Sequence, residues 1–315
     1  MLTSTEQFHA HLTYDPDKRL GQGSFKTATP ALLDFEGQQP LTGLGGPDVK
    51  RSPFGSIEVA IKRPFINNPP TSALGPSAPS RRGTGRGGRS SAGRGGIQGV
   101  KRMGMADERH ALTNEAKLLV WANALLTFSY DFINHCVAEA MKEGMAIPDY
   151  IDAIPSFRFV KAGLATALQL VETKQGAGKP SGNCVTYLIE EMLPVGKGGE
   201  FIKYINNANT VPCLPAEHPA YHYCEFLLFL QHVQFETTHR NAFLTDFQGV
   251  DTTLTDPQII TNPALGENLF GGGNLHKSFM SFPEQHICNR YCKWPWFGLK
   301  PILPHSVTSQ NSHQG

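Results

Sequence analysis

The sequence contains no apolar run of the roughly 18 residues that a membrane-spanning helix needs. Its first residues, Met1 to Glu6, also lack the basic and then apolar layout of a secretory signal peptide. These two absences exclude membrane-spanning and secreted classes at the level of sequence. We therefore expect a soluble intracellular protein, cytoplasmic and without a membrane partner.

Cysteine is scarce as well, since the chain has six, and only Cys288 and Cys292 stand close together. Without a secretory signal, this spacing favours free thiols or a metal site over a disulfide framework. An excess of charge of one sign is also lacking, with 28 basic and 27 acidic residues. Net charge therefore points to no particular partner.

The basic residues are unevenly distributed, because seven of them fall in one short Gly/Ser-rich stretch: Arg81, Arg82, Arg86, Arg89, Arg94, Lys101 and Arg102. The surrounding residues 66–105 have almost no large apolar side chain, which predicts a disordered insertion. Its Arg/Gly composition could contact RNA through mobile charge. Its serines and threonine, including Ser80, Thr84, Ser90 and Ser91, could instead be phosphorylated in regulation.

The remaining pattern predicts an α+β fold with a strand-rich first half and a mixed second half. Strands are expected at 56–62, 156–162, 185–193 and 242–247, and helices at 108–142 and 221–235. The first helix should bury a stripe formed by Leu112, Ala116, Leu119, Trp121 and Leu125. We expect a lead over 1–19, one domain over 20–299 with a hinge near 190–199, and a flexible tail over 300–315.

The first chemical motif is a glycine turn followed by a strand that ends in lysine. Gly21 and Gly23 would let backbone N–H groups approach phosphates, and Lys62 closes the run Val-Ala-Ile-Lys. Glu115 on the next helix is the candidate carboxylate to orient Lys62. The third glycine of the usual kinase loop is Lys26 here, and the sequence has neither the Asp-Phe-Gly motif nor a His-Arg-Asp loop.

A second motif holds two aspartates and a glutamine near the end of an expected strand. Asp246, Gln248 and Asp256 could supply oxygen ligands to Mg²⁺, although aspartates at strand ends are also ordinary turn residues. We expect Pro257 to hold Asp256 in an extended conformation.

A third motif, His286-x-Cys288-x₃-Cys292, groups metal-binding side chains within seven residues. A structural zinc ion takes four ligands, so a fourth is required. His232, on an apolar helix face, could be that ligand or a hydrogen-bonded core residue, and His239 and His276 are the alternatives.

The order of these motifs resembles the alpha-kinase family, whose members include myosin heavy chain kinases and elongation factor 2 kinase. The likeness rests on Asp246-Phe-Gln-Gly, Leu254-Thr-Asp-Pro-Gln, Phe270-Gly-Gly-Gly-Asn-Leu and the His/Cys motif, and extends back through Gly199-Glu-Phe-x-Lys-Tyr to the glycine turn. It covers most of residues 20–293 apart from the insertion and a stretch around 131–180.

The resemblance implies a two-lobed, ATP-dependent serine/threonine protein kinase that acts on a protein substrate and uses Mg²⁺ and a structural Zn²⁺. It implies catalytic roles for Lys62, Asp246 and Asp256, and magnesium ligation by Gln248 and Asp256. It selects His232 as the fourth zinc ligand beside His286, Cys288 and Cys292. The nucleotide contacts that it implies are Gly21, Gly23, Lys62, Glu115, Glu191, Met192, Gln248, Asp256 and Asn274.

One departure from the family pattern is His276, which stands where a glycine is usual. It leaves open a second interpretation, a catalytically inactive, pseudokinase-like binding module that keeps the fold. A third is an RNA-associated protein that acts through the insertion.

Overall fold

The structure is a computed structural model of the 315-residue chain. It describes residues 7–66 apart from 24, 38–43, 45–48, 50 and 52–54, and residues 101–302 apart from 170–182, 197–198 and 267–268. Most of the expected insertion, with its four candidate phosphorylation sites, lies outside the described residues. So does the tail from residue 303.

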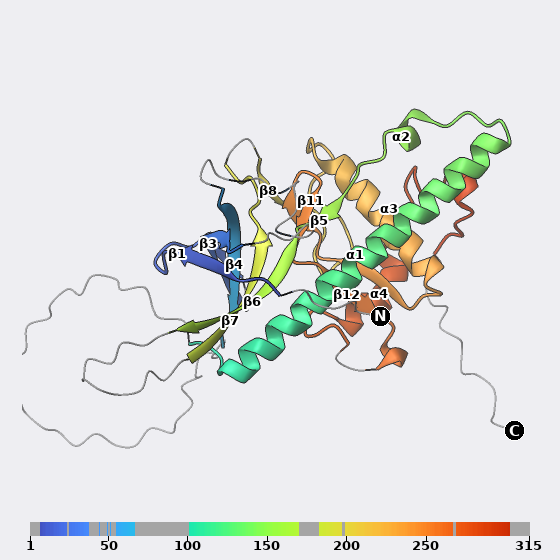
Figure 1. The fold of residues 1–315 in the computed structure, drawn as a ribbon. Helices are drawn as coiled ribbons and strands as arrows, with labels where there is room; N and C mark the ends of the chain where they lie inside the picture. The colour runs from blue at the N-terminus through green and yellow to red at the C-terminus, as the bar shows by residue number, and fades with distance from the viewer. Residues whose placement is uncertain are drawn as a thin grey trace, which may run out of the picture.

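A curled antiparallel sheet forms the first half of the fold (Figure 1). Its strand order is β1-β3-β4-β7-β6, and β2 pairs with the first residues of β3. The strands are β1 (Ala10–Tyr14), β2 (Gly21–Gln22), β3 (Lys26–Phe35), β4 (Ile57–Pro64), β6 (Ala162–Gln169) and β7 (Asn183–Glu191). Because β1 pairs along its whole length with β3, the sheet begins at Ala10, within the lead expected over 1–19.

The two ends of the expected insertion meet at the base of this sheet. Phe65 and Arg102 form a β-bridge, and the Ile66 amide donates to the carbonyl of Lys101 at 2.9 Å. Helix α1 (Met105–Lys142) starts directly afterwards. The boundaries 66–105 were therefore too wide, because residues 101–105 already belong to the ordered fold.

Helix α1 crosses the molecule diagonally and links its two halves (Figure 1). Its inner face is apolar and includes the fully buried Leu112 and Ala122, so this face packs against the core of the protein. Trp121 was wrongly placed in this stripe, because its side chain is 57% exposed. It follows the exposed Val120 on the outer face and makes an edge-to-face contact with the Phe270 ring, with centroids 6.4 Å apart.

A second sheet of four short strands has the order β5-β11-β10-β8: β5 (Arg158–Phe159), β11 (Thr253–Thr255), β10 (Gln248–Val250) and β8 (Phe201–Lys203). The single strand expected over 156–162 is wrong, since β5 pairs with β11 in this sheet and Ala162 begins β6 in the other. The chain crosses between the sheets again from β7 to β8, at the expected hinge.

Helix α3 (Tyr221–Thr237) forms the centre of the second half and is buried on all sides from Phe226 to Phe235. Around it lie α2 (Asp149–Asp152), β9 (Ala242–Thr245), β12 (Gln258–Thr261), α4 (His276–Gln285) and two short 3₁₀ helices, Pro263–Leu265 and Pro295–Phe297. Antiparallel pairing of β9 and β12 brackets the segment that carries Asp246 and Asp256.

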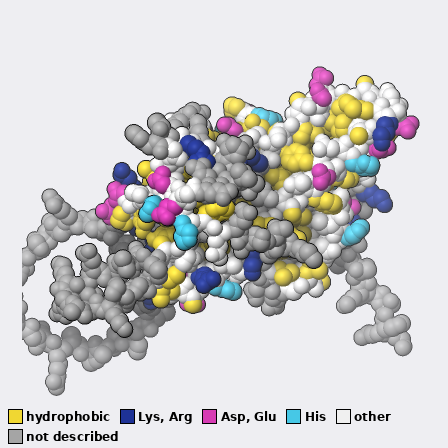
Figure 2. All heavy atoms as spheres, in the orientation of Figure 1, with side chains coloured by type: hydrophobic (Ala, Val, Ile, Leu, Met, Phe, Trp, Pro, Cys, Tyr) yellow, Lys and Arg dark blue, Asp and Glu magenta, His cyan; other side chains and the backbone are white. Residues whose placement is uncertain are grey.

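The visible surface mixes charges of both signs, and hydrophobic side chains gather near the end of α1 (Figure 2). Two α1 residues, Phe128 and Met141, are 44% and 58% exposed. Within the described ranges, no helix combines the length with the apolar character that crossing a bilayer requires.

Candidate functional site

Lys62 extends from β4 into the junction between the two sheets. Its side chain is almost fully buried, and its Nζ lies 2.8 Å from Glu190 Oε2 and donates to Thr255 Oγ1 at 3.1 Å. The Thr255 hydroxyl in turn donates to Glu190 at 2.7 Å. Lys62 on β4, Glu190 on β7 and Thr255 on β11 therefore form a closed triangle that joins the first sheet to the second.

The expected pairing of Lys62 with Glu115 is wrong. Glu115, on α1, forms an ion pair with Lys26 at the start of β3, and Lys26 also reaches Asp256 Oδ1 at 2.5 Å. Register explains the difference, since Lys62 stands opposite Leu188 and one diagonal step from Glu190 on the paired strand. A carboxylate on the same sheet face is nearer than one on the helix.

Asp246 and Asp256 both have a left-handed backbone, with φ of 57° and 54°. The extended conformation expected for Asp256 is thus wrong, even though Pro257 follows it. Non-glycine residues adopt this region only at some energetic cost, and aspartate tolerates it better than most. With this backbone conformation, both carboxylates contact lysines. Asp256 Oδ1 lies 2.5 Å from Lys26 Nζ, and Asp246 Oδ1 lies 2.7 Å from Lys203 Nζ.

Burial and the neighbouring charges shift the pKa values of these groups in different directions. Burial alone would raise the pKa of Asp256, but Lys26 and Lys62 outweigh it and hold that pKa well below its usual range. Burial raises the pKa of Asp246, and Lys203 offsets only part of this shift. Burial would lower the pKa of Lys62, yet Glu190 and Asp256 reverse its effect. Asp256 is therefore a firmly ionised carboxylate facing a firmly charged lysine.

Gln248 joins this group through strand register. On β10 it stands directly opposite Thr255 of β11, so the two side chains leave the sheet on the same side. Gly249 makes the close pairing possible, since a Cβ there would lie 2.0 Å from the Thr253 carbonyl oxygen. The structure thus brings Lys62, Gln248, Asp246 and Asp256 to one junction.

The expected nucleotide contacts are distributed around it. Gly21 lies in β2, and Gly23 turns the chain back so that its amide donates to the Lys26 carbonyl at 2.9 Å. The amide of Glu191 is already bonded to the Lys161 carbonyl at 2.8 Å, and its carboxylate binds Arg158 through two 2.8 Å contacts. Met192, the other expected nucleotide contact at the hinge, directly follows β7. It is partly buried and lies outside the strand pairing.

The Asn274 side chain forms hydrogen bonds that hold its loop in place. Its amide accepts from the Thr261 amide at 2.9 Å and donates to Thr261 Oγ1 at 2.7 Å and to the Leu269 carbonyl at 2.9 Å. Gly273 lies so close to Gln258 that a Cβ would come 1.6 Å from Gln258 Oε1. His276 begins α4 without a positive φ, so the loss of the family's glycine causes no backbone strain.

The four predicted zinc ligands form a second, separate cluster. One ligand atom from each of His232, His286, Cys288 and Cys292 lies within 4.8 Å of the others. Cys292 Sγ is 3.7 Å from His286 Nε2, and Cys288 Sγ is 3.8 Å from His232 Nδ1. A tetrahedral zinc ion would separate sulfur and nitrogen ligands by about 3.6 Å. Neither His239 nor His276 belongs to the group.

The protonation of the cluster also suits a metal. The Lys300 carbonyl lies 3.0 Å from His232 Nε2 and fixes that atom as the N–H donor, which leaves Nδ1 with its lone pair toward Cys288. Burial lowers the pKa of both histidines, that of His286 to about 3. His286 Nδ1 is buried and has no hydrogen-bond partner among the described residues. Burial raises the pKa of Cys292 to about 12, so a bound cation would displace that proton.

We call the junction around Lys62, Asp246, Gln248 and Asp256 the lysine site. The sequence did not predict the roles of four of its residues: Lys26, Glu190, Lys203 and Thr255. Glu190 carried a usable signal, because it shares a strand face with the buried Leu188 and a buried carboxylate needs a cationic partner. Lys26 also stood out as the residue that replaces the third glycine.

Comparison with known protein families identifies the family of this chain. The alpha-kinase family model matches residues 110–292, more than half of the chain. This range includes Glu190, Gln248, Asp256 and the His/Cys cluster, whereas Lys26 and Lys62 precede it.

Curated relatives are similar over shorter stretches. Myosin heavy chain kinase B of Dictyostelium discoideum is 33% identical over 112 residues, 35% of this chain and 14% of that protein. Mouse alpha-protein kinase 2 is 34% identical over 130 residues, 41% of this chain and 6% of that protein. The matches thus span only a small part of either relative.

Among solved structures, the alpha-kinase domain of myosin-II heavy chain kinase A in complex with adenosine aligns with 94% of this chain and 89% of its own, at 16% identity and a TM-score of 0.49. The family model, which covers both the Gln248–Asp256 segment and the His/Cys cluster, decides the assignment: the chain belongs to the alpha-kinase family.

Proposed function

We propose that this chain is an atypical serine/threonine protein kinase that transfers the γ-phosphoryl group of Mg-ATP to a protein substrate. The observation that carries the proposal is the buried Lys62, held by Glu190 and Thr255 at the junction where Gln248 and Asp256 also lie. Phosphoryl transfer depends on positioning and on neutralising phosphate charge, and a fixed, charged lysine beside oxygen ligands supplies both.

Each residue has a separate task in this mechanism. Lys62 binds phosphate oxygens and stabilises the charge that shifts among them during transfer. Asp256 remains ionised, so it can accept a hydrogen bond from the attacking hydroxyl and align it. Asp246 keeps Lys203 in place near the same junction. Bound Mg²⁺ would neutralise further phosphate charge, with Gln248 and Asp256 as the residues that hold it.

A structural zinc ion, bound by His232, His286, Cys288 and Cys292, would contribute to stability rather than to chemistry. Two nitrogen and two sulfur ligands complete a tetrahedral set and leave no open position for water. We place the catalytic domain from β1 to about residue 299, including the strand at Ala10–Tyr14. The RNA-binding alternative concerns residues outside the described ranges, and no contact of the described residues favours a pseudokinase.

The direct test is transfer of labelled γ-phosphate from ATP to a generic basic protein. We expect the label to enter serine and threonine, as identified by phosphoamino-acid analysis of the product. Incorporation should require added Mg²⁺. A chain that folds, binds ATP and still transfers no phosphate would refute the kinase assignment and favour the binding module.

The partner of Lys62 can be tested with two matched variants, Glu190→Gln and Glu115→Gln. Removing the Glu190 charge leaves a buried lysine without its closest carboxylate, which is costly, so we expect transfer to fall about 100-fold or more. Glu115→Gln leaves Lys26 paired with Asp256, and we expect a loss of about tenfold or less. The reverse order of the two losses would restore the helix carboxylate as the functional partner.

A further inference from the structure

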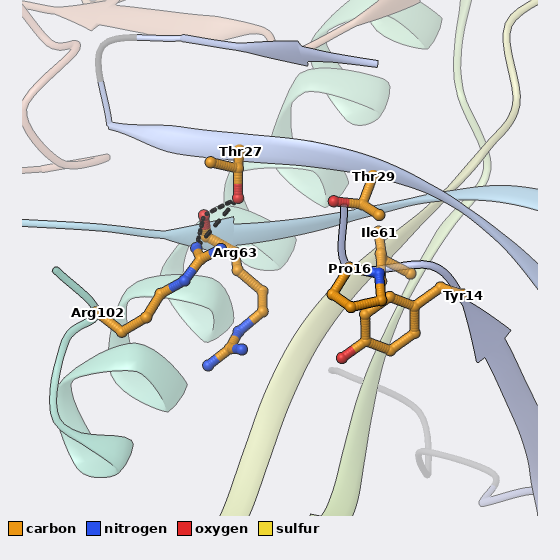
Figure 3. Close-up of a pocket in the computed structure, with 7 residues that line it drawn as sticks. All are labelled: Tyr14, Pro16, Thr27, Thr29, Ile61, Arg63 and Arg102. Carbon is orange, nitrogen blue, oxygen red and sulfur yellow. Dashed lines mark hydrogen bonds between the residues drawn. The ribbon is translucent and has the colours of Figure 1, made fainter. Parts of the chain in front are cut away.

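A small cavity lies on one face of the curled sheet, away from the site around Lys62. Its volume is about 80 Å³, and its polar lining comes from Tyr14 on β1, Thr27 and Thr29 on β3, Arg63 on β4, and Arg102 just before α1 (Figure 3). Side chains alternate along a strand, so Arg63 points to the face of β4 opposite to Lys62. The cavity is therefore separate from the proposed nucleotide site.

The cavity has more positive than negative charge around it. The nearly fully buried Glu108 accepts from Arg63 Nε at 2.7 Å and from Nη2 at 3.1 Å, which neutralises one guanidinium. Arg102 makes no ion pair with any described residue. Its Nη1 donates to Thr27 Oγ1 at 3.1 Å and to the Arg63 carbonyl at 3.3 Å (Figure 3). It also donates to the Pro64 carbonyl at 3.3 Å.

This arrangement leaves one guanidinium without a counter-charge in a partly closed space. Burial lowers the pKa of Arg102, the neighbouring Arg63 lowers it further, and Glu108 offsets only part of the shift. The remaining N–H groups of Arg102 make no hydrogen bond within the described part of the chain. A bound anion would relieve the repulsion and satisfy these donors together.

The size and donor set select the class of anion. A cavity of about 80 Å³ holds more than one water and leaves room for a small tetrahedral oxyanion. A planar guanidinium binds phosphate oxygens in pairs, and the Thr29 hydroxyl adds a donor from β3, whereas the Tyr14 hydroxyl is already paired with that of Tyr187 at 3.0 Å. We propose that this cavity is a binding site for a phosphate-type oxyanion, either free phosphate or a phosphorylated serine or threonine.

The proposal does not depend on the kinase activity, and inorganic phosphate is its first probe. The full chain should show a saturable rise in melting temperature with phosphate, at ionic strength matched with chloride. Arg102→Gln should weaken the apparent phosphate affinity about tenfold or more, because a charge-assisted hydrogen bond is lost. Arg109→Gln, which removes the same charge from an exposed position on α1, should leave the affinity unchanged.

Arg102 also braces the start of α1, so its variant could lose stability for that reason alone. Thr29→Val is the second variant, since the Thr29 hydroxyl makes no hydrogen bond within the described structure. It should keep the melting temperature without phosphate and weaken the phosphate response. An equal response in the wild type and both variants, or no saturable response in the wild type, would overturn the proposal.

The two sources of phosphate are separated by competition with a peptide. The sequence that returns to Arg102 contains Ser90 and Ser91, so a peptide spanning residues 84–98 with phosphate at Ser90 is compared with inorganic phosphate. Tighter binding of this phosphopeptide, lost in Arg102→Gln, would assign the site to a phosphorylated side chain. Binding no tighter than that of inorganic phosphate would assign it to free phosphate.

Discussion

Asp256→Asn should reduce phosphoryl transfer by about 100- to 1,000-fold, with little change in folding. The substitution keeps the size of the side chain and removes the charge that faces Lys26 and Lys62. Asparagine also tolerates the left-handed backbone at this position, where φ is 54°. The loss should appear mainly in kcat, since the carboxylate is expected to act on the attacking hydroxyl and the metal.

Asp251→Asn is the matched control. Asp251 is exposed in the turn between β10 and β11, has a φ of 49°, and undergoes the same chemical change five positions away. We expect its transfer rate to stay within about twofold of the wild type, because a surface substitution away from the site perturbs little. Equal rates in wild type and Asp256→Asn would contradict the proposed role of Asp256.

Removing the metal should destabilise the second half of the protein more than any single substitution outside the core. We expect one zinc ion per purified chain and a large fall in melting temperature after chelation. Structural zinc sites contribute about 10–16 kcal/mol in small zinc-finger peptides, comparable with the whole stability of about 5–15 kcal/mol of a typical domain. The reason is local: the cluster ties α3 to the segment from His286 to Cys292.

Cys292→Ala and Cys136→Ala form the matched pair for this experiment. Both cysteines are buried, at 5% and 8% exposure, but only Cys292 belongs to the cluster. We expect Cys292→Ala to lose the zinc and melt at the temperature of the chelated wild type, while Cys136→Ala keeps its metal. Metal content by mass spectrometry, measured beside calorimetry, gives the comparison. Full stability in a chain shown to be free of metal would exclude a structural zinc site.

Several features of the fold could be predicted from sequence because they depend on near neighbours. The apolar spacing of α1 and α3, the alternation of β4 and the strand-like run of β7 indicated these elements within a few residues of their bounds. The four members of the metal cluster were also identified, since His286, Cys288 and Cys292 lie within one short segment. The fourth, His232, required the family resemblance.

Three predictions failed because the outcome depends on packing between distant segments. Glu115 was chosen for Lys62 because a helix carboxylate often holds such a lysine, yet Glu190 occupies that position. Trp121 was expected inside and lies outside, since a one-residue difference of helical phase turns a side chain by about 100°. The strand expected over 156–162 is divided between two sheets, which no local pattern records.

The sequence by itself determined which residue types stand at which spacing: the lysine that ends a buried strand, the two aspartates around a glutamine, and the closely spaced His/Cys ligands. Only the tertiary structure decided which charges meet, namely Lys62 with Glu190, Lys26 with Glu115 and Asp256, and Arg102 with no carboxylate among the described residues. The physical reason is range. Alternation and helical period act between neighbours in the chain, whereas ion pairs form between whichever side chains strand register and packing bring within a few ångströms.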